Sequence, residues 1–403
     1  MKVQNVSRIR QMDFMFYPAW VLYVAVIMME SSVFAMGNST VELLYKLLRY
    51  LVYTLCFIKI CRTKYTLSDI PFLVVFVIVF ILGYYSSKNR ILLFNCLILL
   101  ASYKMENDKT IKMTAYTQGL ILFLVIFLSQ TGLLLDYVFD KGVRERHSLG
   151  FIWTTVGPIT FFFFVMSYVY CKRRKIKIYQ VILFELINYW LYRKTNTKMV
   201  FALTTLFLFF IFFERRNKKR FKFLSKFKII YIVYPFLAWF LVVIVCKLYN
   251  PNINTWANIN SLLSGRLRLS QEAMNFYGVH LLGNEVEWKG SDIFHTTYAP
   301  GEYNYVDSSY LQLSINYGII FMFIVMLLFS YGIYKHIKAN DYYTVVIYIF
   351  ILTLTMTEPQ LMKFAYNPFT LLAFGIVSRD ISASKYIKSH RKNRNYIQEI
   401  IIK

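Results

Sequence analysis

Apolar runs separated by short polar connectors make up most of this chain. Each run approaches the roughly 20 residues of helix needed to cross the hydrocarbon core of a membrane. The pattern predicts about twelve spans, at residues 14–34, 43–61, 71–86, 91–103, 114–135, 151–171, 178–192, 199–213, 229–248, 309–334, 343–357 and 365–380. We therefore expect an all-α polytopic membrane protein in which residues 1–403 form a single bundle domain.

One polar connector, residues 250–308, is far longer than the others. Long connectors are uncommon in compact proteins and usually carry function. This connector contains the sequence SGRLR at 264–268, NEVEW at 284–288 and His295, and it ends in VDSSY at 306–310. We expect the functional residues to lie in it.

The composition supports a membrane protein. Hydrophobic residues make up 57% and aromatic residues 19% of the 403 residues, and the mean hydropathy is +0.46. These values exceed what a water-soluble domain can cover with polar surface. The first apolar run follows Lys2, Arg8 and Arg10, as in a signal peptide. No small-residue cleavage site follows it, so we expect the run to remain as the first span.

The net charge of +25 is explained by topology better than by a nucleic-acid partner. Lys and Arg crowd the short connectors at 172–177 and 215–228, and short basic connectors stay in the cytoplasm, where they also meet anionic lipid headgroups. With an even number of spans, both termini are cytoplasmic and the 250–308 connector faces outward. We expect a multi-pass protein of the plasma membrane.

Several basic residues fall on connectors that this topology assigns to the outside. They are Lys88, Arg90, Lys141, Arg144, Arg146, Arg193, Lys194, Lys198, Arg266 and Arg268. Cations placed against the topology rule predict an anionic ligand at the outer face, and a lipid-linked pyrophosphate is the obvious one there. A few outward charges are also ordinary, which is the alternative interpretation.

The sequence contains little that predicts a metal or cofactor. The five histidines are scattered, and all five cysteines lie in or at the ends of spans. No closely spaced metal-ligand pair, Asp-x-Asp motif or glycine-rich phosphate loop appears. We expect neither a metal nor a cofactor, and no nucleotide-driven chemistry.

Two groups of short motifs occur at the expected outer face. The first is RHSLGF at 146–151, which opens a span and is followed by WTT at 153–155. The second comprises SGRL at 264–267, YG at 277–278, LG at 282–283, VDSSYL at 306–311 and YGIIF at 317–321, in a long outer loop leading into a span. Both groups resemble motifs of Wzy-type oligosaccharide repeat-unit polymerases of Gram-positive bacteria, although WTT departs from that family's usual HPN.

The resemblance implies a GT-C-like inverting glycosyltransferase that needs no metal. Such an enzyme transfers a growing glycan from undecaprenyl pyrophosphate to the next lipid-linked repeat unit, for a capsule or another exopolysaccharide. It also implies a flippase and a chain-length regulator as partner proteins. The reaction needs fixed cations to stabilise the leaving pyrophosphate and a group that takes a proton from a sugar hydroxyl.

Four arginines are candidates for binding the substrate. Residues 264–277 are helix-compatible, with Gly278 as a stop, and no acid lies four residues after Arg266 to neutralise it. Arg268 has Glu272 at that spacing, so a solvated ion pair competes with a ligand role. Arg144 and Arg146 flank Glu145, and the resemblance favours Arg146.

Asp307 and His295 are the candidates for the catalytic base. Asp307 precedes a long apolar run, so it is equally well placed to cap a helix. His147 is a further outward histidine. Tyr310 belongs to an aromatic group around the outer loop that can stack on sugars, although such residues also collect at membrane interfaces.

Other classes of function remain open. A flippase or another secondary transporter would share the many spans and cations, but it should show internal repeats and broken helices, and no repeat is found in the sequence. A lipid-linked glycan ligase or a membrane scaffold is not separated by fold resemblance. Glu30 lies within a predicted span, where an acid is costly, and Arg49 or Lys46 is placed to pair with it.

Overall fold

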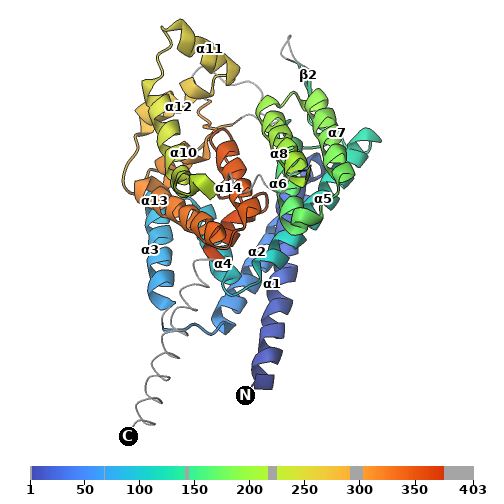
Figure 1. Ribbon diagram of the computed structural model, residues 1–403, viewed down its shortest axis with the longest axis vertical. Coiled ribbons are helices and arrows are strands. Elements are labelled where there is room, and N and C mark those ends of the chain that lie inside the picture. The colour runs from blue at the N-terminus through green and yellow to red at the C-terminus, as the bar shows by residue number, and fades with distance from the viewer. Residues whose placement is uncertain (1, 68, 141–144, 217–224, 291–302, 376–403) are drawn as a thin grey trace.

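The computed structural model describes residues 2–67, 69–140, 145–216, 225–290 and 303–375 (Figure 1). The described chain is mostly helical, and β1 (Val138–Asp140) and β2 (Glu145–His147) form a small antiparallel ribbon. The helices are α1 (Lys2–Glu30), η1 (Val33–Ala35), α2 (Ser39–Arg62), α3 (Ile70–Ser87), α4 (Arg90–Ser102), α5 (Asn107–Gln130), α6 (Val156–Lys172), η2 (Arg173–Lys175), α7 (Ile178–Thr195), α8 (Lys198–Arg216), η3 (Ser225–Phe227), α10 (Lys228–Leu248), α11 (Asn254–Leu262), α12 (Arg266–Tyr277), α13 (Ser309–Lys338) and α14 (Tyr342–Leu354).

The prediction of an all-α chain is confirmed. By length and composition, four helices among the described residues can cross a membrane, namely α3, α5, α10 and α13. Three shorter apolar stretches of helix are Met15–Glu30 within α1, α4 (Arg90–Ser102) and α14 (Tyr342–Leu354). These are fewer than the predicted twelve, because helices such as α7 and α8 carry charged residues at their ends. The last predicted span, 365–380, lies partly outside the described residues.

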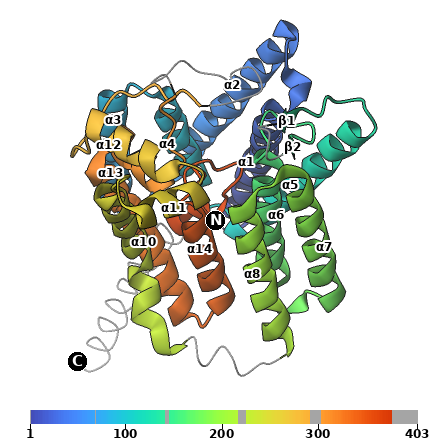
Figure 2. The ribbon, with the colours of Figure 1, turned by 90° about the horizontal axis from the view of Figure 1, so that it is seen from above.

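The helices fall into two neighbouring groups (Figures 1 and 2). In one group α1 packs on α2 and α5, and α5 to α8 follow in order. In the other, α13 packs between α3, α10 and α14, with α12 against α10. Helices α8 and α14 lie side by side where the groups meet (Figure 2). The short helices α11 and α12 cover one end of the second group.

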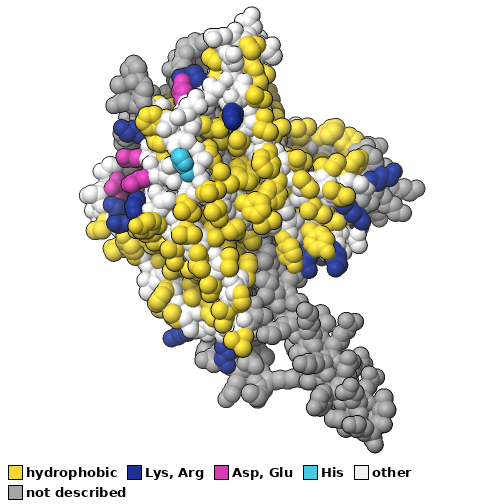
Figure 3. All heavy atoms as spheres, turned by 90° about the vertical axis from the view of Figure 1, so that its left-hand side faces the viewer, with side chains coloured by type: hydrophobic (Ala, Val, Ile, Leu, Met, Phe, Trp, Pro, Cys, Tyr) yellow, Lys and Arg dark blue, Asp and Glu magenta, His cyan; other side chains and the backbone are white. Residues whose placement is uncertain are grey.

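The apolar helices differ in how much of their surface is covered. In α13, 72% of the most apolar 18-residue window is buried, against 28% in α10 and 33% in α3. Figure 3 shows a broad field of hydrophobic side chains on the face formed by this group, with charged side chains mainly toward its margins. An exposed apolar belt with charged margins is the surface expected to face lipid.

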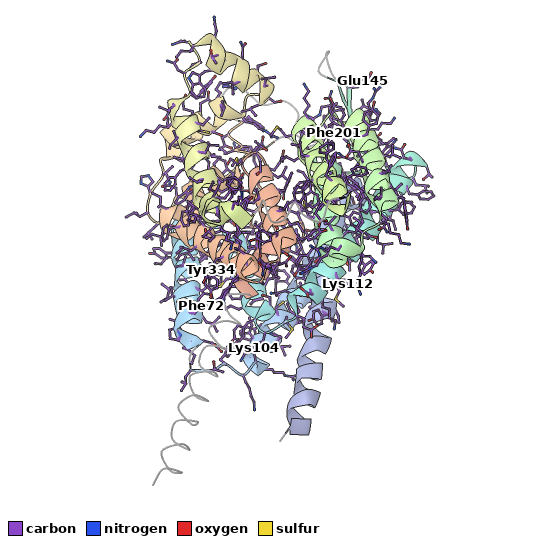
Figure 4. All side chains as sticks on the ribbon, in the orientation of Figure 1. Phe72, Lys104, Lys112, Glu145, Phe201 and Tyr334 are labelled. Atoms are coloured by element: carbon purple, nitrogen blue, oxygen red, sulfur yellow. The ribbon has the colours of Figure 1, made fainter. Side chains whose placement is uncertain are left out.

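Contacts between connectors gather at two ends of the bundle. At one end the side chain of Tyr170 donates a hydrogen bond to Asp108 over 2.5 Å, and Arg173 pairs with Asp341 at 3.1 Å. At the other end the amide of Val33 donates to the carbonyl of Gly150 over 2.9 Å. Lys104 and Lys112 lie toward the first end and Glu145 and Phe201 toward the second (Figure 4). Successive connectors therefore lie at alternate ends.

Helix α13 is broken at Gly318, where φ is 90° and ψ is 169°. Residues 280–284 of the long connector enter this break. The amide of Ile319 donates to the carbonyl of His280, and that of Asn284 donates to the carbonyl of Ile315. A Cβ atom on Gly283 would lie 2.2 Å from the carbonyl oxygen of Asn316. The released backbone groups are thus satisfied by the connector, which fixes its path over the bundle.

The acid in the first apolar run has the expected type of partner. Glu30 ends α1 and pairs with Arg49 of α2 at 3.2 Å. The alternative partner Lys46 does not form this pair. Pairing is the common way to retain an acid at such a position, so Glu30 has a structural role.

Candidate active-site cavity

A cavity of about 800 Å³ opens at the end of the bundle that carries α11, α12 and β2. Its walls come from β2 and the segment that follows, the start of α8, the start of α12, residues 303–307 and residues 358–363. The charged residues that line it are Arg146, Lys198, Arg266, Arg268, Asp307, Glu358 and Lys363. The 250–308 connector, where the functional residues were expected, supplies three of these seven.

Arg266 is held between two carboxylates at the cavity wall. Its Nε donates to Oδ2 of Asp307 over 2.7 Å, and its Nη2 donates to Oε1 of Glu358 over 3.0 Å. Gly265, with φ of 84°, precedes the first residue of α12 and turns the chain so that Arg266 begins the helix. The three residues come from α12, the segment before α13 and the segment after α14, so only the folded bundle brings them together.

As expected, no acid of α12 pairs with Arg266; its partners Asp307 and Glu358 instead come from segments far away in the sequence. A guanidinium carries five N–H donors, and two of them make these bonds. The remaining three make no hydrogen bond with another described residue. Arg266 therefore holds the carboxylates of Asp307 and Glu358 in place and still has N–H groups that make no bond to them.

Asp307 does not cap α13. The residue at the cap position is Ser308, and its side chain makes no capping hydrogen bond. The Asp307 carboxylate instead turns to Arg266, because an ion-paired hydrogen bond is stronger than a neutral cap. This leaves Asp307 about one quarter exposed and facing the cavity.

Glu358 is the charged cavity residue that sequence reasoning missed. It is 3% exposed. Burial is the largest influence and raises the pKa of Glu358 to about 7, while Arg266 lowers this pKa and Asp307 raises it. The pKa of Arg266 is lowered by burial but raised overall by Glu358 and Asp307. The available signal was an acid followed by Pro359 at the end of an apolar run, where acids are rare.

The other cations spread around the cavity. Arg146 donates from Nε to the carbonyl of Thr195 over 2.9 Å, which joins β2 to the turn before α8. Neither Lys198 nor Lys363 forms an ion pair with another residue that the structure describes. The lining thus carries five basic side chains against two carboxylates, an excess that attracts an anion.

Arg268 and Tyr310 have structural partners. Arg268 lines the cavity, yet it also pairs with Glu272 at 2.8 Å, with both side chains more than half exposed, so the predicted solvated pair is present. Tyr310 is fully buried and donates to the carbonyl of Leu352 over 2.9 Å. It does not line the cavity, so the structure does not bring this predicted binding residue to the site.

The two remaining candidates, His295 and Arg144, lie outside the described residues. The alternative histidine, His147, has its Nδ1 2.6 Å from Oδ2 of Asp136. The same Asp136 accepts a hydrogen bond from the amide of Leu149 and so fixes the turn after β2. His147 is not among the residues that line the cavity.

Within the described residues, no three His, Cys, Asp or Glu side chains lie close enough to hold a metal ion. Comparisons with models of protein families, with curated proteins and with solved structures find no match for this chain.

Proposed function

We propose that this chain is a membrane glycosyltransferase that polymerises lipid-linked oligosaccharide repeat units. The observation that carries the proposal is the cationic cavity in which a buried carboxyl and Asp307 share the guanidinium of Arg266. It combines the two chemical requirements of glycan transfer from a pyrophosphate, an anion-binding wall and a proton acceptor. The type of reaction, polymerisation of repeat units, is inferred from the resemblance of the sequence motifs to those of repeat-unit polymerases.

The leaving pyrophosphate would be stabilised by the basic side chains of the lining. Lys198, Lys363 and Arg146 line the cavity, and Arg266 has three further N–H donors. Charge that develops on the leaving oxygens is best stabilised by donors already fixed in place. Arg266 is fixed on two sides, by Asp307 and by Glu358.

Glu358 is the base in this proposal. A general base works best when its pKa is near the working pH, and burial raises the pKa of Glu358 to about 7. It takes the proton from the acceptor hydroxyl while the glycan leaves pyrophosphate. Arg266 and Asp307 are positioning residues for that carboxylate. The earlier candidate Asp307 remains the second choice, because it also faces the cavity.

The proposal includes a membrane orientation. We assign the cavity to the outer face of the plasma membrane and both termini to the cytoplasm, because the 172–177 and 215–228 connectors are the most basic. About twelve passes and a GT-C-like arrangement belong to the same proposal. The substrate is the undecaprenyl-pyrophosphate-linked repeat unit.

Substitutions at Arg266 and Glu358 test this function. Glu358→Gln keeps the size and an oxygen that accepts from Arg266, but it cannot take a proton, so we expect polymer synthesis to fall by about 10²- to 10⁴-fold. Arg266→Lys keeps the charge but cannot reproduce the two fixed hydrogen bonds to Asp307 and Glu358, so we also expect a severe loss of polymer synthesis. Arg268→Lys is the matched control and should be mild. Membranes with normal protein levels are assayed for chain length on lipid-linked repeat units.

Long polymer in Glu358→Gln would remove Glu358 from the reaction, and long polymer in Arg266→Ala would remove Arg266. A loss in Arg268→Lys as large as in Arg266→Lys would mean that total cationic charge matters rather than the fixed carboxylate pair.

A secondary transporter is the second candidate, and the break in α13 favours it. Broken helices that expose backbone groups are typical of transporter substrate sites. Here, however, the released groups are bonded to residues 280–284. The two candidates separate in a proteoliposome assay, since a transporter moves the lipid-linked unit without changing its length.

A further inference from the structure

A second cavity of about 320 Å³ adjoins the first one. It lies between α1, the start of α4, the first turns of α13 and residues 359–365. The two cavities share the side chains of Trp288, Tyr305, Pro359 and Lys363. A volume near 300 Å³ is at the lower end of the range of about 300 to 1,000 Å³ that is typical of small-molecule sites.

The lining of the smaller cavity is aromatic and neutral. The lining has four amide side chains and four aromatic rings, namely Asn89, Asn95, Gln312 and Asn316, and Tyr23, Trp288, Tyr305 and Tyr317. Lys363 is the one charged side chain among the described residues that line it, and it stands on the wall shared with the larger cavity. The smaller cavity therefore suits an uncharged ligand that has both apolar faces and hydrogen-bonding groups.

Two polar atoms of this lining are buried without a partner in the described part of the chain. They are Oδ1 of Asn316, whose residue is 4% exposed, and Nε1 of Trp288. A buried polar atom without a partner costs roughly 1 to 3 kcal/mol, so such atoms call for an explanation. One is an acceptor and the other a donor, and a ligand with hydroxyl groups satisfies both. An isoprenoid chain satisfies neither.

We propose that the smaller cavity binds an uncharged sugar ring. The ring would stack on the aromatic side chains. One of its hydroxyls would donate to Oδ1 of Asn316, and another would accept from Nε1 of Trp288. This step rests on the proposed function in one respect, that the ring is the sugar attached to the pyrophosphate held in the larger cavity. The shared wall allows one ligand to reach both cavities, with its charged part beside Lys363 and its neutral part beyond.

Binding of simple sugars to the purified protein tests the inference without requiring catalysis. The probes are the methyl glycosides of glucose, galactose and N-acetylglucosamine, observed by saturation-transfer difference NMR in detergent. We expect at least one glycoside to bind the wild-type protein. Inorganic pyrophosphate should not displace it, because pyrophosphate occupies the larger cavity.

Two variants remove one polar partner each. Trp288→Phe keeps an aromatic ring and loses the N–H, and Asn316→Leu keeps the size and loses the acceptor. Each should weaken glycoside binding roughly ten-fold or more, the loss of one ligand hydrogen bond. Asn316→Leu should melt at or above the wild-type temperature, because it removes an unpartnered buried group. The matched control is Trp256→Phe in α11, which lines neither cavity and should bind as wild type.

The proposal is overturned if no glycoside of the set binds the wild-type protein, or if Trp288→Phe and Asn316→Leu bind as well as the control. Displacement of the glycoside by farnesol would assign the cavity to the isoprenoid chain and overturn it as well. Glycoside binding together with an absence of polymer synthesis would instead reject the proposed function and leave the sugar site in place.

Discussion

At the scale of single residues, the electrostatics of the cavity depend on one guanidinium that bonds to two carboxyl groups. Arg266 bonds to Asp307 at the surface of the cavity and to Glu358 in its wall. One positive charge cannot fully compensate two neighbouring negative charges, so a proton on the buried carboxyl is favoured. Glu358 is that carboxyl, which explains why its pKa is raised rather than lowered by its surroundings.

This division predicts opposite shifts of the pH profile in two variants. In the wild type, kcat/KM for polymerisation should rise with pH through about 7, as Glu358 loses its proton. Asp307 raises the pKa of Glu358 and Lys363 lowers it. Asp307→Asn should therefore move the midpoint of the rise to lower pH, and Lys363→Met should move it to higher pH. Profiles measured on solubilised enzyme at fixed ionic strength test both shifts.

The two variants also distinguish the carboxylates. Polymerisation that persists in Asp307→Asn with a shifted midpoint assigns proton transfer to Glu358. Complete loss in Asp307→Asn at every pH, with normal folding, would assign it to Asp307 instead. Midpoints that move in the same direction in both variants would contradict the electrostatic account of the site.

Tyr310 was a predicted substrate-binding residue, but in the structure it does not line the cavity. Its hydroxyl donates to the carbonyl of Leu352 inside the bundle. Tyr310→Phe should lower the free energy of unfolding by about 0.5 to 1.5 kcal/mol, the net value of a typical buried hydrogen bond. Polymer length and glycoside binding should not change. A normal melting temperature with shortened polymer would restore Tyr310 as a substrate-binding residue.

At the scale of helices, the elements that could be predicted are those with a local signal. Residues 264–277 were expected to form a helix that stops at Gly278, and α12 runs from Arg266 to Tyr277 with Gly278 as its cap, at φ of 71°. The apolar runs for α3, α5 and α10 are likewise helical. Local spacing and a glycine stop are sufficient for such elements.

The break in α13 and the partners of Arg266 could not be predicted in this way. Nothing near Gly318 distinguishes it from a glycine inside a continuous apolar helix. The break exists because residues 280–284 replace the lost backbone bonds. Glu358 similarly meets Arg266 from 92 positions along the chain. Both features depend on contacts between distant segments, which one sequence does not encode in any local pattern.

Glycine substitutions test the joint between the connector and α13. A Cβ atom would lie 2.2 Å from a backbone oxygen at Gly283 and 2.3 Å from one at Gly318, and both residues have positive φ. Gly283→Ala and Gly318→Ala should each destabilise by more than about 3 kcal/mol, since strain and backbone overlap act together. Gly37→Ala has a similar φ of 71° but open space around it. In this control the free energy of unfolding should fall only by the cost of a positive φ for a residue with a Cβ atom, roughly 1 to 2 kcal/mol.

Melting temperatures of the three variants in detergent give the comparison. Equal losses at Gly37, Gly283 and Gly318 would show that positive φ alone matters, and that the close approach of the connector to α13 is not needed for stability.

At the scale of the whole molecule, the connectors at the two ends of the bundle are held by separate sets of contacts. The Tyr170–Asp108 hydrogen bond and the Arg173–Asp341 ion pair lie at one end, and the cavity lies at the other. The described residues of the long connector therefore lie at the opposite end from the basic connector at 172–177. Charge asymmetry then decides which end faces the cytoplasm.

This arrangement predicts which thiols an impermeant reagent can reach in intact cells. Asn252 precedes α11 at the cavity end, and Lys175 lies in η2 at the basic end; both are exposed. In a variant whose native cysteines are replaced, Asn252→Cys should react with a membrane-impermeant maleimide in intact cells. Lys175→Cys should react only after the cells are permeabilised. The native cysteines Cys61 and Cys171 are exposed near the basic end, which is why they are replaced first.

The labelling result bears directly on the proposed reaction, because lipid-linked repeat units are polymerised where the glycan faces outward. Labelling of Lys175→Cys in intact cells, with protection of Asn252→Cys, would place the cavity in the cytoplasm. The basic residues of the lining would then follow the ordinary topology rule, and no anionic ligand would be needed to explain them. Equal labelling of both variants would mean that residues 175 and 252 are not separated by a membrane, and the multi-pass arrangement itself would be wrong.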